Sequence, residues 1–365
     1  MKIGLLTVHC SVNPGASLQA YALCRALEKN GHNVEIINYR PYYFTDAADI
    51  NAKRYRKSIM EIIKYLLTKG RLDRVHNKYA EFEKKFLPNE TERYNDFNQL
   101  INSNLKYDVF MCGSDQIWNP SHVKHDPSMH LGFVKSSDSK KYSYAASIGK
   151  DKLDKKDIEF LKNCTLSIDN ISVREESAKE TLLKIDKQKQ IQRHIDPTML
   201  LSIEEWESIE SYAYRKIKGP YAIFYPMVDN EITDDLLREF KNKMNIQIVA
   251  LTGKIKKLKY VDKQIRVFSP EDFVGYIHHS EYVITNSFHG NVFAMMFSKK
   301  LIPYNNPSSN SRLLDLYKLF HVDAKQVFTI EDFRNTMIEE WKPVSIPADI
   351  LDKEREKSQR FLSFS

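Results

Sequence analysis

The sequence predicts an α/β protein built from two doubly wound domains, each with a parallel sheet covered by helices. Three observations predict this class. The chain has 365 residues, and one domain typically takes about 100–200 residues. Short apolar segments alternate with helical patterns in two successive sets, which is typical of βαβ units. A polar stretch, residues 201–218, separates the two sets and ends at Gly219-Pro220.

The first set opens with an apolar strand at Lys2–Val8. A loop follows, and the periodicity then predicts a helix over Ser17–Asn30, capped by Ser17 and ended by Gly31. A strand at Asn33–Tyr39 completes the first βαβ unit, so the sheet is expected to be parallel. The other strands expected in this domain are Tyr107–Cys112, Lys141–Ala146, Asn170–Val173 and Gln190–Ile195.

Residues 50–105 interrupt the alternation with a helical, strongly basic insert. A solvated helical face is the first interpretation, and a surface for a membrane or a polyanion is the alternative. The basic residues in question are Lys53, Arg54, Arg56, Lys57, Lys64, Lys69, Arg71, Arg74 and Lys78.

The second set repeats the strand–helix order and ends in a charged helix from Ala348 to Leu362. Ser269 followed by Pro270 and two acids is a clear helix start. We therefore divide the chain into an N-terminal domain (1–200, with its insert), a C-terminal domain (201–345) and a terminal helix (346–365). The strands expected in the second domain are Tyr221–Tyr225, Ile246–Leu251, Gln264–Phe268, Tyr282–Thr285 and Leu301–Tyr304, with helices at Thr233–Met244 and Asn291–Ser298.

Composition narrows the classes of function. The net charge of +7 suits anionic partners but is too small and too dispersed to indicate nucleic acid. The four cysteines have no metal or redox spacing, and we expect buried thiols and no metal site. The start of the chain lacks the features of a secretory signal, and no apolar run is long enough for a membrane span, so we expect a cytoplasmic protein.

The strongest candidate site in the second domain follows the strand Tyr282–Thr285. Asn286, Ser287 and His289 place three polar side chains at a helix N-terminus, whose free N–H groups suit a phosphate or carboxylate. Gly290 allows close backbone approach, and His289 can exchange a proton near neutral pH. The structural alternative is that Asn286 or Ser287 only caps the helix.

Two loops in the first domain also follow strands, where a doubly wound sheet binds its ligand. Neither contains the Gly-x-Gly-x-x-Gly pattern, so a dinucleotide cofactor is not indicated. Three histidines follow the second loop, but their spacing is too loose to predict a metal site. The candidate substrate-binding residues of the loops are Asn13, Gly15, Gln19, Gly113, Ser114 and Trp118, with Asp115 among them as a candidate base.

Two arginines lie at expected helix starts. Arg174 follows the strand Asn170–Val173, at the helix end where a cation is disfavoured by the dipole. Binding an anion would explain it, and pairing with a neighbouring acid such as Glu175 would explain it equally well. Asn310 and Arg312 form a second such start after the His289 loop.

Taken together, these segments resemble the polysaccharide pyruvyl transferase family, in the family's order over about residues 1–320. Where many members have Arg-Leu-His-Gly, this chain has Ser287-Phe288-His289-Gly290, which puts the donor phosphate contact in doubt. The segments that carry the resemblance are Asn13–Leu23, Gly113–Asn119, Tyr144–Gly149, Ser172–Ser177, Asp196–Thr198 and Thr285–Gly290.

The resemblance implies a fold similar to the GT-B glycosyltransferases, with two domains facing a cleft. It implies phosphoenolpyruvate as donor substrate, no other cofactor, and a sugar acceptor that receives a pyruvate ketal. The acceptor would belong to a capsule or exopolysaccharide, or to its polyprenyl-linked precursor at the inner face of the membrane.

On this basis we predict His289 as general acid, Arg174 or Arg312 as the anion-holding cation, and Asp115 as the base for the acceptor hydroxyl. The acceptor would lie near Asn13 and Trp118. Two other functions stay open from the sequence: a nucleotide-sugar glycosyltransferase of the same architecture, and a non-catalytic glycan-binding subunit of a synthesis complex.

Overall fold

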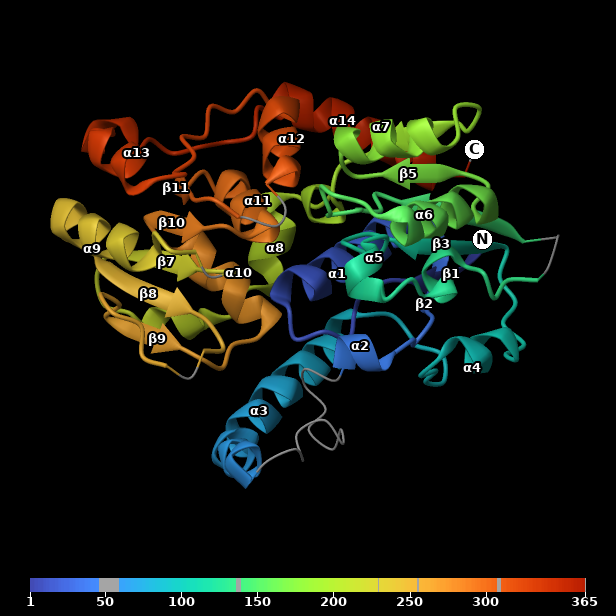
Figure 1. Ribbon diagram of the computed structural model, residues 1–365, viewed down its shortest axis with the longest axis horizontal. Coiled ribbons are helices and arrows are strands. Elements are labelled where there is room, and N and C mark those ends of the chain that lie inside the picture. Colours follow the sequence, from blue (N-terminus) through green and yellow to red (C-terminus); the bar gives the residue numbers. More distant parts are fainter. Residues whose placement is uncertain (46–58, 136–138, 229, 255, 307–309, 365) are drawn as a thin grey trace. The chain divides into compact units, whose positions relative to one another are not determined.

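The computed structural model describes residues 1–45, 59–135, 139–228, 230–254, 256–306 and 310–364. The chain divides into two compact units (Figure 1). The first consists of Met1–Leu200 together with Glu354–Ser365, and the second of Leu201–Lys353. Each unit has its own parallel sheet and its own hydrophobic core.

In the first unit, four strands form a sheet of order β2-β1-β3-β4, and β5 and β6 pair beside it. All pairings are parallel, and bridges from Tyr142 to Asn170 and from Ala146 to Val173 connect β5 to the β4 edge. The strands are β1 (Lys2–Leu6), β2 (Asn33–Ile36), β3 (Val109–Gly113), β4 (Lys140–Tyr144), β5 (Ile171–Val173) and β6 (Ile191–Arg193), and the helices are α1 (Pro14–Lys29), α2 (Tyr42–Thr45), α3 (Ile59–Phe86), α4 (Phe97–Ile101), α5 (Pro120–Val123), α6 (Lys155–Ser167) and α7 (Glu176–Ile185).

Both faces of this sheet are buried, which is why β3 reads as an unbroken apolar run, Val-Phe-Met-Cys-Gly. Because side chains alternate along a strand, Val109 and Met111 pack with α1 on one face. Phe110 and Cys112 pack on the opposite face, where α6 contributes Leu161 and Cys164. The sheet is therefore a central layer between helices.

The second unit has one five-stranded parallel sheet of order β11-β10-β7-β8-β9. Leu236, Leu237 and Phe240 of α9 cover one face of it. Helices α8, α10 and α11 pack together through Trp206–Phe293 and Phe273–Phe293 ring contacts. The strands are β7 (Tyr221–Tyr225), β8 (Gln247–Leu251), β9 (Lys263–Ile265), β10 (Tyr282–Thr285) and β11 (Lys300–Pro303), and the helices are α8 (Ile203–Ile209), α9 (Thr233–Met244), α10 (Pro270–His278), α11 (Phe288–Met296), α12 (Ser311–Leu319) and α13 (Ile330–Asn335). The terminal helix α14 (Ala348–Leu362) begins in the second unit, and its residues from Glu354 onward belong to the first.

Helices α1 and α11 each begin three residues earlier than predicted. Helix α1 begins at Pro14, and the Asn13 side chain caps it by accepting from the Gly15 and Ala16 N–H groups. Helix α11 begins at Phe288 with Ser287 as its cap, not at Asn291. Asn-Pro is a cap followed by proline at the first helical position, a stronger signal than the hydroxyl of Ser17 on which the prediction relied. The start of α10 after Ser269 is confirmed, with a complete capping box.

The end of the chain returns to the first unit. Phe361 contacts the ring of His194 at 4.6 Å, and Phe364 contacts the ring of Tyr142 at 4.8 Å. Arg193 on β6 donates to Glu354 at 2.6 Å. The terminal helix expected from periodicity thus completes the core beneath β4.

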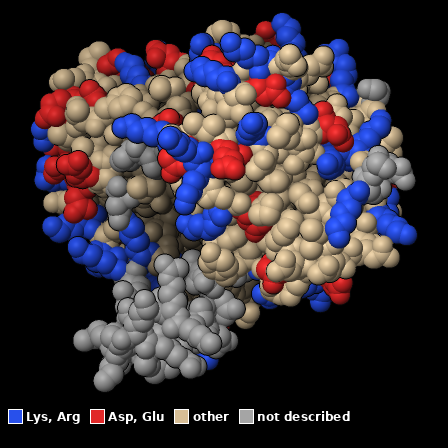
Figure 2. Space-filling model, turned by 45° about the vertical axis from the view of Figure 1, so that its right-hand side comes forward, with Lys and Arg blue, Asp and Glu red and all other residues tan. Residues whose placement is uncertain are grey.

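Within the basic insert, Ile59–Phe86 form the long helix α3. The side chains of Lys53, Arg54, Arg56, Lys57 and Lys64 lie outside the described residues, so the prediction of a surface for a membrane or a polyanion remains a prediction. Lysines and arginines on the face shown in Figure 2 are interspersed with acidic residues. Within the described residues, helices with the length and apolarity of a membrane span are absent.

Candidate functional site

Each unit has a topological switch point, a pair of neighbouring parallel strands from which the chain leads to opposite edges of the sheet. It lies between β1 and β3 in the first unit and between β7 and β10 in the second. Doubly wound folds bind ligands beyond the carboxyl ends of the strands at this point. The loops predicted from the sequence, Asn13–Gln19, Gly113–Asn119 and Asn286–Gly290, follow β1, β3 and β10 respectively.

Asn286 joins the two loops at the switch point of the second unit. Its carbonyl oxygen accepts from the Met227 N–H at 2.7 Å, and its amide donates to the Val228 carbonyl at 2.8 Å. The Asn306 amide in turn donates to the Asn286 backbone carbonyl at 3.1 Å. Asn286 therefore fixes the backbone around the site, and this is a different role from the direct ligand contact that we predicted.

Ser287 and Gly290 form the start of α11. The Ser287 hydroxyl accepts from the Gly290 N–H at 3.3 Å, which confirms the capping alternative for Ser287. A Cβ atom at Gly290 would lie 2.6 Å from Oγ1 of Thr285, so the glycine is needed for the close packing of α11 on β10. The Thr285 hydroxyl holds the same corner by donating to the Tyr225 carbonyl at 2.6 Å.

His289 lies in the first turn of α11 and is nearly buried, with 4% of its surface exposed. Its ring contacts the ring of Phe288 edge-on at a centroid distance of 5.3 Å. The guanidinium carbon of Arg312 lies 5.9 Å from the centroid of the same Phe288 ring, so an arginine from α12 reaches the residue next to His289. Asn310, just before α12, accepts from the Gln326 amide at 2.5 Å.

In the first unit, the loop after β1 is held by its own side chains. Asn13 caps α1 through the Gly15 and Ala16 N–H groups. The Gln19 amide donates to the Thr7 hydroxyl at 2.9 Å, and its carbonyl accepts from the Ser114 N–H at 3.2 Å. Gln19 is fully buried. It therefore joins the two loops of the switch point, as Asn286 does in the second unit.

The loop after β3 packs tightly on β4. Gly113 has a φ of +126°, and a Cβ atom there would lie 2.2 Å from the Tyr144 carbonyl oxygen, so only glycine fits. The Ser114 hydroxyl donates to the Ala145 carbonyl at 2.9 Å and is fully buried. Gly113 and Ser114 thus shape the loop, and neither presents a side chain to a substrate.

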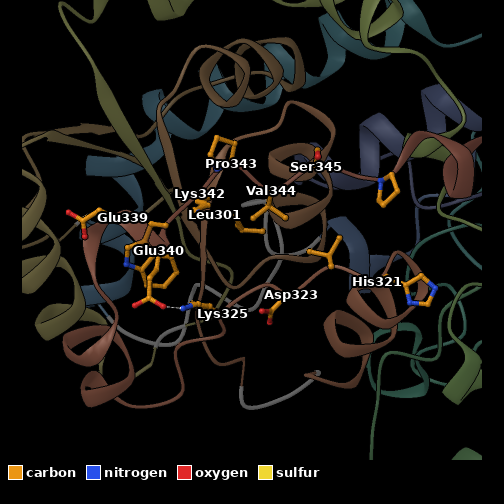
Figure 3. A pocket seen from close by; sticks show the side chains of 13 residues that line it. Leu301, His321, Asp323, Lys325, Glu339, Glu340, Lys342, Pro343, Val344 and Ser345 are labelled. Carbon is orange, nitrogen blue, oxygen red and sulfur yellow. Dashed lines mark hydrogen bonds and ion pairs between the residues drawn. The ribbon is translucent and has the colours of Figure 1, made fainter.

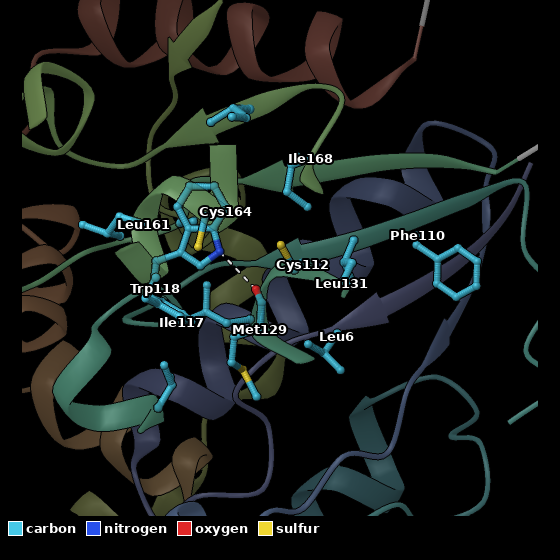
Figure 4. Packing of buried hydrophobic residues seen from close by; sticks show 14 of the residues in the cluster. Leu6, Phe110, Cys112, Ile117, Trp118, Met129, Leu131, Leu161, Cys164 and Ile168 are labelled. Atoms are coloured by element: carbon cyan, nitrogen blue, oxygen red, sulfur yellow. Dashed lines mark hydrogen bonds between the residues drawn. The ribbon is translucent and has the colours of Figure 1, made fainter. Parts of the chain in front are cut away.

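The prediction that Trp118 contacts the acceptor is wrong, because Trp118 belongs to the hydrophobic core. Its side chain is fully buried among residues that include Ile117 and Cys164 (Figure 4). Its indole N–H donates to the Met129 carbonyl at 3.0 Å. A ring enclosed on all sides cannot form the acceptor surface that we predicted.

Arg174 lies at the centre of a buried charge network at the carboxyl ends of β3 to β6. Its Nε donates to Glu175 at 2.8 Å, and its Nη1 donates to Asp196 at 2.7 Å. Burial by itself would lower the pKa of Arg174, but the negative charges of Glu175, Asp196 and Asp115 outweigh it and raise the pKa. The ion-pairing alternative therefore accounts for an arginine at this helix start.

Asp115 is the network member nearest to solvent, with 13% of its side chain exposed. One carboxylate oxygen lies 3.9 Å from Nη1 of Arg174, and the backbone has a φ of +56°. Its carbonyl accepts from the Ser147 N–H at 2.9 Å. Asp115 is therefore the least buried carboxylate next to the buried cation of Arg174.

The three histidines after Trp118 do not converge. His125 pairs with Asp157 at 2.9 Å, and Nδ1 of His130 lies 3.1 Å from the Ser167 hydroxyl. His122 is an exposed residue of α5. His125 and His130 therefore have separate partners.

A cavity of about 630 Å³ lies elsewhere in the second unit, between the turn after α12 and residues 339–347. Lys325 and Glu340 form an ion pair at its wall (Figure 3). None of the residues that the sequence singles out line this cavity. It is therefore separate from the switch-point loops.

Several residues that shape the site were missed by the sequence reasoning. Thr285 and Asn306 support the His289 loop, and Asp196 pairs with Arg174. The only signal for Asp196 was its place in Asp196-Pro197-Thr198, where its carboxylate also accepts from the Thr198 N–H and hydroxyl. Asn306 lies in a segment without a recognisable motif.

Comparisons with known proteins identify one family by sequence and a fold by structure. A model of the polysaccharide pyruvyl transferase family matches residues 13–309. Two similar solved structures are UDP-GlcNAc 2-epimerases. The enzyme from Methanocaldococcus jannaschii, in complex with UDP-GlcNAc and UDP, has a TM-score of 0.57 at 15% identity and covers 100% of both chains. That from Neisseria meningitidis, bound to UDP-GlcNAc, has a TM-score of 0.56 at 12% identity, covering 99% of this chain and 100% of the other.

No curated protein matches the chain. The structural likeness, at these identities, concerns the fold alone. It confirms the predicted class, an α/β protein with two Rossmann-like domains similar to the GT-B architecture.

Proposed function

Because the chain belongs to the polysaccharide pyruvyl transferase family, we propose that it transfers pyruvate from phosphoenolpyruvate to a sugar and forms a ketal across two hydroxyl groups. The observation that carries this proposal is the family match over residues 13–309. The matched segment includes His289, which lies in the first turn of α11 at the switch point of the second unit.

The reaction needs one proton donor and two proton acceptors. His289, as imidazolium, gives its proton to the methylene carbon of phosphoenolpyruvate, and a sugar oxygen then bonds to the neighbouring carbon. The C–O bond to phosphate breaks, inorganic phosphate leaves, and a second sugar oxygen bonds to the same carbon. Of the two hydroxyl protons, one restores His289 and the other leaves with phosphate. General acid catalysis of this kind typically contributes about 10²–10⁴-fold.

Arg312 is the better candidate for holding the donor anion. Arg174 is enclosed by two carboxylates within hydrogen-bond distance, so it has little positive charge to offer. The Arg312 guanidinium lies over the ring of Phe288, the residue before His289. Many family members have an arginine two positions before the histidine, where this chain has Ser287. The N-terminal end of α11 adds a partial positive charge at the same place.

Asp115 is proposed as the base that first receives the hydroxyl proton that then leaves with phosphate, because it is the least buried carboxylate of the Arg174 network. The acceptor is proposed to be a sugar of a surface polysaccharide or its polyprenyl-linked precursor. The role proposed for Asn13 is a contact to this sugar through the loop that it caps.

The first experiment is thermal unfolding with phosphoenolpyruvate and, in parallel, with a panel of nucleotide diphosphates. A donor at about 100 times its Kd adds about 2.7 kcal/mol of stability. Stabilisation by phosphoenolpyruvate alone supports the proposal. Stabilisation by UDP alone would instead favour a nucleotide-sugar glycosyltransferase. No stabilisation by either would favour a non-catalytic glycan-binding subunit.

The decisive variant is His289→Ala, assayed by phosphate release from phosphoenolpyruvate with glycosides that offer neighbouring hydroxyl pairs. We expect turnover to fall at least 100-fold, while the melting temperature of the variant stays close to that of the parent. His289→Gln, which keeps a polar side chain but cannot act as an acid, should be equally inactive. His122→Ala, the same change at an exposed histidine of α5, is the control. Retention of most of the rate in His289→Ala would rule out the proposed acid.

A further inference from the structure

Within the described part of the chain, one group of histidine and carboxylate side chains brings three possible metal ligands together. It consists of Glu210, directly after α8, His278, the last residue of α10, and His279, which caps that helix. Their ligand atoms all lie within 4.8 Å of one another. All three residues belong to the second unit. We propose that this group binds a zinc ion.

The carboxylate of Glu210 is placed between the two rings. One oxygen lies 2.8 Å from Nδ1 of His278, and the other lies 2.9 Å from Nε2 of His279. Ligands of a tetrahedral zinc ion are about 3.4 Å apart, given metal–ligand distances of about 2.0–2.2 Å. The two Glu210 contacts would lengthen by about half an ångström, and ligand atoms up to 4.8 Å apart would move closer. Side-chain rotations can make both changes, and the ion would replace the two shared protons.

The rings are held in place before any ion binds. His279 stacks on Tyr214 at a centroid distance of 3.6 Å and an interplanar angle of 11°. His278 stacks on Phe297 at 4.4 Å and 26°. Because these contacts restrict ring rotation, less conformational entropy is lost when the metal binds.

His278 also has a second carboxylate behind it. Its Nε2 lies 3.5 Å from an oxygen of Glu207. A carboxylate at the distal nitrogen of a ligating histidine orients the ring and increases its basicity, and its loss typically weakens binding about 10–100-fold. The C-terminal end of α10 adds a partial negative charge that favours a cation.

The ligand types favour zinc over magnesium or calcium. Two imidazole nitrogens and one carboxylate are typical of Zn²⁺, whereas Mg²⁺ and Ca²⁺ prefer oxygen ligands only. The side chains of Glu210, His278 and His279 are 9%, 21% and 34% exposed. Solvent can therefore reach the group, and water can take the fourth position. The ion would connect the end of α8 to the end of α10.

The test is titration calorimetry of the full, tag-free chain with Zn²⁺, together with thermal unfolding in Zn²⁺, in Mg²⁺ and in a chelator. We expect one Zn²⁺ per chain, a higher melting temperature in Zn²⁺ than in chelator, and no effect of Mg²⁺. Glu210→Gln and His279→Ala should bind at least tenfold more weakly. His122→Ala, the same change at an exposed histidine outside the group, should bind like the parent.

Visible absorption of Co²⁺ in place of Zn²⁺ reports nitrogen coordination directly. We expect the bands to appear in the parent and to be lost in His279→Ala. Glu207→Gln should retain one site with about tenfold weaker affinity. Absence of Zn²⁺ binding by the parent would overturn the proposal. So would parent-like affinity in Glu210→Gln and His279→Ala when circular dichroism shows both variants folded. Neither result bears on pyruvyl transfer, because no ligand of the group lies at a switch-point loop.

Discussion

At the scale of single residues, most polar side chains in the motifs stabilise the protein around the site. Asn286 and Gln19 each connect two loops, Ser287 caps a helix, and Arg174 is enclosed by Glu175 and Asp196. Only a few side chains combine a reactive group with a place at a switch point. The residues proposed for the chemistry are His289 and Asp115, which lie at switch points, and Arg312 of α12.

Replacing Arg174 tests whether its role is structural. Arg174→Met leaves the buried carboxylates of Glu175 and Asp196 without their cation, and such a loss typically costs about 3–5 kcal/mol of stability. Urea unfolding should show this decrease. The control is Arg334→Met, which removes an exposed pair with Glu239 and should change stability little. A stable Arg174→Met protein with a raised KM for phosphoenolpyruvate would instead return this arginine to the donor site.

At the scale of elements, the helices at the switch points begin with caps that belong to the motifs. Asn13 starts α1 and Ser287 starts α11, and each lies directly after a strand and its loop. The same residue type can therefore explain both the helix start and a ligand contact. A substitution that keeps the cap separates these two roles.

Substitutions of Asn13 can separate helix capping from substrate contact. Asn13→Ala should lower the free energy of unfolding by about 0.5–2 kcal/mol, because the N–H groups of Gly15 and Ala16 lose their acceptor. Asn13→Ser keeps a capping oxygen and should regain most of this stability. If Asn13 also contacts the acceptor, Asn13→Ser should still raise the KM for the sugar. Parent-like stability and KM in both variants would exclude both roles.

At the scale of the whole molecule, the chain forms two units and its last helix completes the first of them. His194 lies at that junction, between the rings of Tyr144 and Phe361, with Nδ1 at 2.8 Å from the Ser172 hydroxyl. Burial, with a contribution from the charges of Lys357 and Arg193, lowers its pKa to about 3. The packing of the C-terminal segment is therefore expected to depend on pH.

The direction follows from proton binding. The unfolded chain binds a proton on His194 below its ordinary pKa of 6.5, and the folded chain binds it only near pH 3. Stability from the neutral ring is thus complete above pH 6.5 and decreases as pH falls below it, by up to about 1.4 kcal/mol per pH unit. His194→Asn should show a smaller decrease between pH 6.5 and 4 in urea unfolding. Identical pH slopes in the parent and the variant would contradict this expectation.

Much of the fold could be predicted because its signals are local. Apolar runs such as Val109–Gly113 mark strands buried on both faces, and Ser269 with Pro270 marks a helix start. The order of strands and helices then determines a parallel sheet, since parallel neighbours require a crossover. Strand and helix ends were less accurate, as at α1, because several polar residues in one loop can cap a helix.

The sequence by itself determined the α/β class, the two sets of βαβ units, the family and the loops that carry the candidate site. The tertiary structure decided which side chains in those loops are buried or paired. Trp118 is enclosed in the core, Arg174 is paired within the first unit, and Arg312 reaches Phe288 from another helix. It also brought Glu210 within hydrogen-bond distance of His278 and His279, 68 and 69 positions along the chain. A local sequence pattern specifies backbone conformation. The burial of a side chain and its hydrogen-bond or ion-pair partners depend instead on residues far apart in the sequence, and a local pattern holds no information about them.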